Sequence, residues 1–229
     1  MEAATPQTIF YLFGLPITDT VVSTWVMMLV IIVIAALIRL FKIDVAERII
    51  AMIHGIIASV MPENTNVMQY LPMLGTLMIF LVFGNIFSIF PMMVSPTANI
   101  NTTFALSLIV FFAVHVYGIK EKGLWGYFKG LASPIFLLPL EIVSQLSRTL
   151  ALTIRLFGNI ISSDMIVAIV FSLIPFILPL PFIALGLLTG ALQAYIFTIL
   201  ASLFIASAIE VESTEDERRR LKQELRQNA

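Results

Sequence analysis

The chain has 229 residues, of which 59% are hydrophobic and only 12% are charged, with a formal net charge of −1 and no cysteine. Its mean hydropathy of +1.01 lies well outside the range of soluble domains, so we expect an integral membrane protein. The lack of cysteine excludes disulfide bonds, thiolate catalysis and cysteine-ligated metals. The two histidines, His54 and His115, are far apart in the sequence, so no metal or other cofactor is expected.

The N-terminal half contains three predicted membrane spans and one shorter amphipathic piece. The first segment, residues 1–20, lacks the basic flank of a signal peptide, so the apolar stretch over residues 21–41 is predicted to be a retained span. Charged side chains are interleaved with apolar ones in residues 44–60, which is typical of a helix lying on the membrane surface. A second span there remains an open alternative. Residues 70–90 and 102–117 form the next two predicted spans.

The C-terminal half contains two apolar segments that are too long to cross a membrane upright. Helices over residues 135–174 and 182–209 would be about 60 Å and about 42 Å long, whereas the hydrocarbon core is about 30 Å thick. Both helices should therefore be kinked, or tilted well beyond the usual ~20°. The sequence predicts an all-α, polytopic protein forming one membrane domain over residues 1–229. It should have five membrane-embedded helices, the last two long and steeply inclined, and one cytoplasmic surface helix.

The distribution of basic residues predicts the orientation of the chain. With five spans, every basic cluster falls on one side of the membrane: Arg39, Lys42, Arg48, Lys120, Lys122, Lys129, Arg218, Arg219, Arg220, Lys222 and Arg226. The positive-inside rule makes that side cytoplasmic, so residues 1–20 are expected outside and the polar tail, residues 213–229, inside. A span over residues 44–60 would separate these clusters, which favours the surface helix.

One predicted membrane helix, the penultimate one, carries the few acidic and basic groups that lie well inside the apolar segments. Glu141, Arg148 and Arg155 are spaced by seven residues and share a helix face, whereas Asp164 lies about 180° around the helix from Arg155. Arginine cannot be deprotonated in a protein, and a charge at bilayer depth costs at least a few kcal/mol. No carboxylate of this chain is well placed to neutralise Arg155. We therefore expect a partner subunit to supply one, the alternative being hydrogen bonds to carbonyls at a helix contact.

The last membrane segment carries one large neutral amide and a stripe of small residues. Gln193 can donate and accept hydrogen bonds, so it can serve either helix packing or function. Gly186 and Gly190 are four residues apart, and together with Ala194 they should let another helix approach closely. Three asparagines are expected near the outer side, with loop capping favoured over water access as their role: Asn85, Asn99 and Asn101.

The last two segments contain two distinctive motifs. The first is the run Arg155-Leu156-Phe157-Gly158-Asn159, preceded by Glu141 and Ser144, and the second is the run Leu192-Gln193-Ala194-Tyr195-Ile196-Phe197. Both motifs resemble subunit a of the F-type ATP synthase. The loop at residues 96–103 and the connection at residues 118–123 are also similar to that family, so the resemblance covers most of the chain. The run from Arg155 to Asn159 alone would be moderate support for this family. Both motifs together with the same pattern of spans are specific for it.

The resemblance implies a stator subunit that carries ions past a rotating ring of c subunits. Arg155 falls on the family's essential arginine, which faces the ring carboxylate, and Gln193 falls on the glutamine that packs against it. Two pairs fall on positions of the half-channels, Asn159 with Asp164 on the outer side and Glu141 with Ser144 on the cytoplasmic side. Helix-packing roles are expected for three glycines: Gly158, Gly186 and Gly190. The sequence departs from some members in having Asp164 in place of glutamate and Gly186 in place of histidine.

The same resemblance implies partners and a location. The expected partners are the c-subunit ring, the b subunits of the peripheral stalk, the F1 sector indirectly and the lipid bilayer, with no nucleic acid. The chain would have no catalytic site of its own, and a bacterial plasma (inner) membrane is the expected location. Proton and sodium versions are not separated by this sequence, because ion choice is expected to reside in the ring.

Two other classes of protein are alternatives to this interpretation. A secondary transporter or ion channel with a midmembrane arginine is the first alternative, but such folds usually contain an internal repeat and none is visible here. A membrane-embedded hydrolase is the second, and the predicted spans contain no Ser/His/Asp or metal-ligating constellation. The sequence therefore favours the ion-translocating stator subunit.

Overall fold

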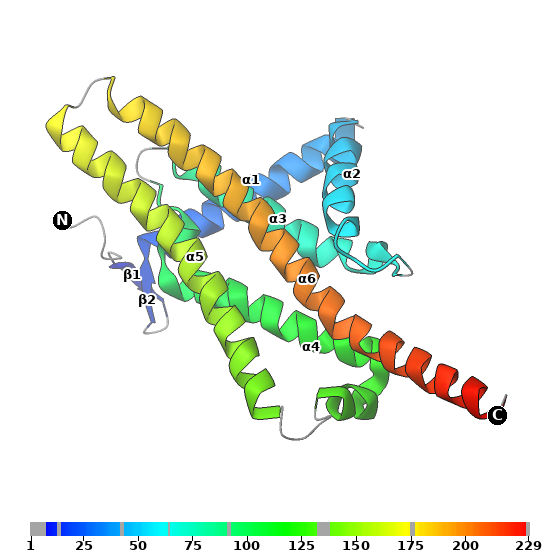
Figure 1. The fold of residues 1–229 in the computed structure, drawn as a ribbon. Helices are drawn as coiled ribbons and strands as arrows, with labels where there is room; N and C mark the ends of the chain where they lie inside the picture. The colour runs from blue at the N-terminus through cyan, green and yellow to red at the C-terminus, as the bar shows by residue number, and fades with distance from the viewer. Residues whose placement is uncertain are drawn as a thin grey trace.

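The computed structural model describes residues 8–227 except 13, 14, 42, 43, 64, 91, 92, 132–137, 175 and 176. Its elements follow one another as β1 (Thr8–Leu12), β2 (Leu15–Thr18), α1 (Asp19–Phe41), α2 (Val45–Ala58), η2 (Val67–Gln69), α3 (Leu71–Phe87), η3 (Pro96–Ala98), α4 (Ile100–Leu131), α5 (Leu138–Leu173) and α6 (Pro179–Gln227), where η marks a 3₁₀ helix. Figure 1 shows the hairpin β1–β2, the end of α5 and the start of α6 towards one end of the molecule. The C-terminal ends of α4 and α6 lie at the opposite end.

The structure confirms a polytopic helical membrane protein. Four helices in the described part of the chain are long and apolar enough to cross a membrane: α1, residues 100–124 of α4, residues 139–173 of α5 and residues 179–209 of α6. The predicted span over residues 70–90 corresponds to α3, an apolar helix of 17 residues. Seventeen residues is at the short end of what crosses a bilayer, so the count of five spans stays a prediction. The steep inclination of α5 and α6 also stays a prediction.

A two-stranded hairpin precedes α1, and the all-α interpretation did not predict it. β1 and β2 pair antiparallel, with Thr8 opposite Thr18 and Leu12 opposite Leu15. The run Thr-Ile-Phe-Tyr-Leu of β1 contains the β-branched and aromatic residues that favour strands. The segment before α1 thus has regular structure that leads directly into this helix.

The predicted surface helix corresponds to α2, which is too short to span a membrane. It has 14 residues, or about 21 Å at 1.5 Å per residue. Ile53 and Ile57 are buried, and Ile53 lies against α3, where its Cγ2 atom is 3.6 Å from the position a Cβ would take on Gly75. Glu47 and Arg48 are exposed. This division into a packed apolar face and a charged face is that of an amphipathic helix.

The buried core is built around α6. Phe197, Ala201 and Ile205 of α6 are fully buried, and apolar side chains of the neighbouring helices surround them in one cluster: Leu74 and Leu81 of α3, Leu106 and Val110 of α4, and Leu152 and Leu156 of α5. Four positions in the buried part of α6 carry small side chains, namely Ala194, Ala201, Ser202 and Ala206. Small residues allow close helix approach, which is the main source of packing energy inside a membrane.

Helix α4 extends beyond the predicted span and turns back on itself at Gly123. The span was expected to stop before Lys120, but helical residues continue to Leu131 across Gly123, which has φ 73° and ψ 162°. The ring of Tyr127 then packs on Gly118, and it makes an edge contact with the ring of His115 at 5.8 Å between centroids. A backbone conformation open essentially only to glycine therefore folds the end of α4 back along the helix.

Replacement of Gly123 by alanine should destabilise the fold by about 1–3 kcal/mol, because an L-residue is strained at this φ and ψ. Gly55→Ala in α2 is the matched control, since a Cβ meets no atom within 4 Å at either position and only Gly123 has a positive φ. The control should be neutral, or stabilising by about 0.5–1 kcal/mol. Thermal unfolding in detergent measures both changes, and equal effects would contradict this account of Gly123.

Candidate functional site

Arg155 lies on the outer face of α5, away from the core of its own chain. Leu152, Leu156 and Ile160 are buried and follow one another at four-residue spacing, so they define the inner face of the helix. Arg155 and Ile154 are exposed. Among the residues that the structure describes, none forms a hydrogen bond or an ion pair with Arg155. The described part of the chain therefore presents Arg155 as a cation without a counter-charge on the surface of an apolar helix.

The other charged groups on the N-terminal half of α5 have partners of their own. The guanidinium carbon of Arg148 lies 5.3 Å from the centre of the Phe204 ring on α6, which is a cation–π contact. Glu141 is half-buried, and its Oε1 accepts a hydrogen bond from Gln145 Nε2 at 3.2 Å. Arg148 is thus held against α6, and Glu141 is engaged by a neutral neighbour one turn along α5.

Glu141 also faces the returning end of α4. Burial raises the pKa of the Tyr127 phenol, and the negative charge of Glu141 raises that pKa further. Tyr127 therefore stays protonated near neutral pH and can donate a hydrogen bond. Ser144 is half-buried on the next part of α5. The two residues predicted for the cytoplasmic side thus lie where α4 folds back towards the start of α5.

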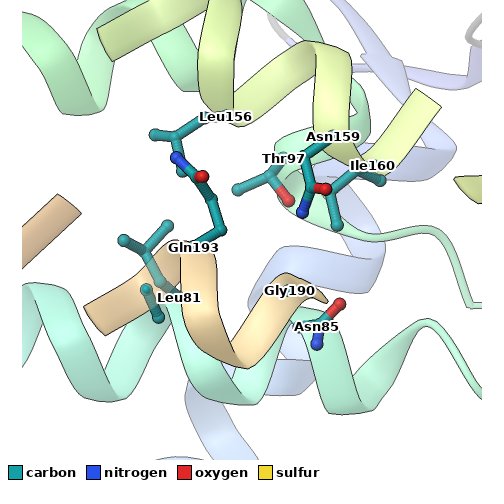
Figure 2. A pocket seen from close by; sticks show the side chains of 9 residues that line it. Leu81, Asn85, Thr97, Leu156, Asn159, Ile160, Gly190 and Gln193 are labelled. Carbon is teal, nitrogen blue, oxygen red and sulfur yellow. The ribbon is translucent and has the colours of Figure 1, made fainter. Parts of the chain in front are cut away.

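A small polar pocket lies between α3, η3, α5 and α6. Four polar side chains line it, one from each of these elements: Asn85, Thr97, Asn159 and Gln193 (Figure 2). Apolar atoms of Leu81, Leu156 and Ile160 form much of the remaining wall. Asn159 Nδ2 and Gln193 Nε2 are buried and have no hydrogen-bond partner among the residues that the structure describes. The pocket is therefore lined by two amide groups whose N–H donors are unpaired within the described part of the chain.

The structure brings together only some of the predicted site residues. Asn159 and Gln193 line one pocket. Gln193 makes no hydrogen bond to Arg155. Gln193 of α6 is buried against the inner side of α5, whereas Arg155 is exposed on the outer side of α5. Asp164 is also exposed and does not line the pocket. The predicted residues thus occupy separate places along α5: Glu141 with Ser144, then Arg155, then Asn159, then Asp164.

Asn85 and Thr97 belong to this pocket, whereas the sequence favoured a loop-capping role for the asparagines near the outer side. Asn85 is buried in α3, and its Nδ2 donates to the Leu187 carbonyl of α6 at 2.9 Å. Asn99 does cap its loop, since its Oδ1 accepts from the backbone N–H of Asn101 at 2.9 Å. The available signal for Asn85 was an amide inside an otherwise apolar helix, which is costly unless it is bonded.

The three glycines predicted to mediate packing have different surroundings. At Gly190 a Cβ would overlap the amide of Asn85, so α3 and α6 approach closely there. At Gly186 a Cβ would lie 3.4 Å from Ser163 Cβ on α5, which is an ordinary contact. At Gly158 no described atom lies within 4 Å of the Cβ position. Gly190 and Gly186 thus adjoin other helices of the chain, whereas Gly158 faces open space.

No metal centre is assembled by the part of the chain that the structure describes. It contains no group of three or more histidine, cysteine, aspartate or glutamate side chains that could hold an ion. His115 is engaged within its own helix, where Nδ1 lies 2.7 Å from the Phe111 carbonyl oxygen.

The fold and the site define a polytopic helical membrane protein that concentrates its intramembrane polar groups on its last two long helices. The sequence model of the family described as ATP synthase A chain matches residues 16–206. The chain is 40% identical over 211 residues to ATP synthase subunit a 2 of Bradyrhizobium sp. (strain BTAi1), an alignment that covers 90% of this chain and 95% of that protein.

Two further relatives agree with this match. The chain is 41% identical over 207 residues to ATP synthase subunit a 1 of Hahella chejuensis, covering 88% of each chain. It is 52% identical over 142 residues to ATP synthase subunit a 1 of Chlorobium luteolum, covering 62% of this chain and 64% of that protein. The chain therefore belongs to the ATP synthase subunit a family, which confirms the resemblance drawn from its two motifs.

Gly190→Ala should destabilise the protein by about 1–3 kcal/mol, because the new methyl group would occupy the place of the Asn85 amide. Asn85 would then lose its hydrogen bond to Leu187. Gly186→Ala on the same helix is the control and should leave stability close to wild type, since its Cβ makes an ordinary contact. Thermal unfolding in detergent measures both, and an unaffected Gly190→Ala protein would contradict the close packing of α3 on α6.

Proposed function

We propose that this chain is the ion-translocating stator subunit of an F-type ATP synthase and carries protons past a rotating ring of c subunits. The observation that carries the proposal is the position of Arg155, a permanent cation exposed on an apolar helix without a partner among the described residues. A charge at membrane depth needs a counter-charge or water. Since the chain belongs to the ATP synthase A chain family, the counter-charge that we propose is the carboxylate of the ring.

Arg155 acts on the ionisation of that carboxylate. A protonated carboxyl is neutral and can face lipid, whereas the ionised form cannot do so without a large penalty. A nearby guanidinium favours the ionised form. Each ring site must therefore release its proton on approaching Arg155 and take up another proton before it returns to the lipid. This requirement converts proton exchange into rotation of the ring.

Two separate aqueous routes serve this exchange. Asp164 and Asn159 line the route from the outside, and Glu141 and Ser144 line the route to the cytoplasm. Glu141 and Asp164 are 23 residues apart on α5, which is about 34 Å along the helix axis and similar to the thickness of the hydrocarbon core. Arg155 lies between them, and its positive charge opposes direct passage of a proton from one route to the other.

The membrane potential supplies part of the driving force, at about 2.3 kcal/mol per charge for 100 mV. The N-terminal segment faces outwards and the C-terminal tail faces the cytoplasm of a bacterial cell. The c ring lies against α5, the b subunits of the peripheral stalk hold the chain in place, and the F1 sector is reached indirectly. The chain has no catalytic site of its own. Family membership argues against the transporter and hydrolase alternatives. A ring that selected sodium would make the same stator carry sodium ions in place of protons.

Arg155→Ala should abolish ATP synthesis driven by an imposed proton gradient, and Arg155→Lys should lower its rate by about tenfold or more. That loss corresponds to about 1.4 kcal/mol or more in activation free energy, since lysine keeps the charge but loses the planar fork. Both variants should still fold, because Arg155 has no contact to lose within the described chain, and copurification of the ring with each variant checks that the complex assembles.

The matched control for this experiment is Arg148→Ala on the same helix. It removes a cation–π contact with Phe204, worth about 0.5–1 kcal/mol at an exposed site, and should retain most of the synthesis rate. Synthesis by vesicles containing the complete complex is measured for all three variants. Near wild-type synthesis by an assembled Arg155→Ala complex would exclude the ring-facing role.

Single cysteines should distinguish two offset routes from one continuous pore, and the natural chain has no cysteine to interfere. A cysteine at Asp164 should react with a water-soluble thiol reagent chiefly from outside, and a cysteine at Glu141 chiefly from the cytoplasmic side. Ile154→Cys, exposed on the same helix, is the lipid-facing control and should react from neither side. Equal reactivity of the first two variants from both faces would indicate a channel instead.

A further inference from the structure

One tyrosine on the returning end of α4 is held in a fixed position. Tyr127 is only 4% exposed. Its ring packs on Gly118, where a Cβ would lie 2.5 Å from Tyr127 Cε2, and its centroid lies 5.8 Å from that of the His115 ring. The turn at Gly123, with its φ of 73°, brings the ring back along α4. Backbone geometry and packing thus fix where the phenol lies.

The start of α5 adjoins this tyrosine. Helices α4 and α5 pack against each other, and the returning end of α4 lies at the same end of the molecule as the start of α5 (Figure 1). Tyr127 is about one turn before the end of α4, and Glu141 is in the first turn of α5. Burial raises the pKa of the Tyr127 phenol, and the negative charge of Glu141 raises it further. The two side chains are therefore close enough for the charge of one to act on the other.

The carboxylate of Glu141 has hydrogen-bonding capacity beyond its contact within α5. Its Oε1 accepts from the neutral Gln145 amide at 3.2 Å, whereas an ionised carboxylate has about four acceptor sites. Arg148, one further turn along α5, is stacked on the Phe204 ring. Glu141 is half-buried, and a carboxylate removed from water needs donors to offset the loss of hydration. A buried phenol that keeps its proton is a suitable donor.

We propose that Tyr127 is a positioning residue of the cytoplasmic route and donates a hydrogen bond, directly or through one water molecule, to the Glu141 carboxylate. The inference rests on the proposed function, because it assigns a partner to the carboxylate of that route. Such a bond favours the ionised carboxylate and keeps it at one place beside α4. Tyr127 retains its own proton, and Glu141 is the group that takes up and releases protons.

Tyr127→Phe tests the role of the hydroxyl, because it keeps the ring and its packing. Passive proton conduction is measured against the pH of the medium in inverted vesicles, which expose the cytoplasmic face, after removal of the F1 sector. The variant should still conduct protons, but its pH profile should move to higher pH by about 0.5–1 unit. This is the size expected for the loss of one hydrogen bond to the ionised form. An unmoved profile would overturn the inference.

Gly118→Ala separates the position of the ring from the presence of the hydroxyl. The new methyl group would take the place of Tyr127 Cε2 and displace the ring, so the profile should move in the same direction. A shift in this variant without one in Tyr127→Phe would show that only ring packing matters, which would also overturn the inference. If Gly118→Ala does not assemble, Tyr127→Phe alone decides.

Tyr117→Phe is the matched control on the same helix. Its hydroxyl donates to the Gln69 carbonyl at 3.5 Å, so its loss should leave the pH profile of the natural chain unchanged. A shift equal to that of Tyr127→Phe would mean that any lost phenol at this end has the effect, and the specific role of Tyr127 would be wrong.

A structure of the complete complex tests the contact without reference to activity. We expect the Tyr127 hydroxyl to bond to the Glu141 carboxylate or to share one water molecule with it, and a phenol bonded only to other groups would overturn the inference. Near wild-type synthesis by Arg155→Ala would overturn the proposed function and this inference with it. Loss of synthesis in Arg155→Ala, together with an unmoved Tyr127→Phe profile, would overturn this inference alone.

Discussion

The structure depends on the rule that polar groups surrounded by hydrocarbon must find their hydrogen bonds within the protein. The helices satisfy the backbone in this way, and six buried hydroxyls within the helices use the same backbone. They donate to carbonyls three or four residues earlier in their own helices: Thr103, Ser107, Thr149, Thr153, Thr198 and Ser202. Amide side chains have no such local solution when they point between helices. The unmet polarity of the bundle is therefore concentrated at the few amides beside α6.

The packing of α6 explains why these amides meet. Gly190 removes the side chain that would separate α6 from α3, and Asn85 occupies the space. Leu152 and Leu156 turn the apolar face of α5 to the same core, which leaves Arg155 on the opposite face. One choice of packing face thus has two consequences for function. It assembles an internal polar pocket, and it exposes a cation to whatever lies beside α5.

The features that have a hydropathy pattern or a motif could be predicted from the sequence. The long apolar helices, the amphipathic α2 and the family were all predicted, because each has a local signal. The features that were missed depend on pairing or on backbone geometry. The β1–β2 hairpin is a short pairing with weak periodicity, and the return of α4 depends on the positive φ of Gly123. The contact of Asn85 with Gly190 joins positions 105 residues apart, which spacing within one helix cannot predict. The expected pairing of Gln193 with Arg155 was not found, because α5 places the two on different faces.

The exposed position of Arg155 also has a consequence for the life of the chain before assembly. A newly inserted copy without its partner leaves a guanidinium in contact with acyl chains or with a local defect in the bilayer, at a cost of at least ~2.5 kcal/mol on insertion scales. Any neighbour that brings a carboxylate to α5 relieves this cost, so association is favoured even where little apolar surface is buried. Under the proposed function, an unassembled copy would therefore leave the Arg155 cation without a counter-charge, whereas an assembled copy would not.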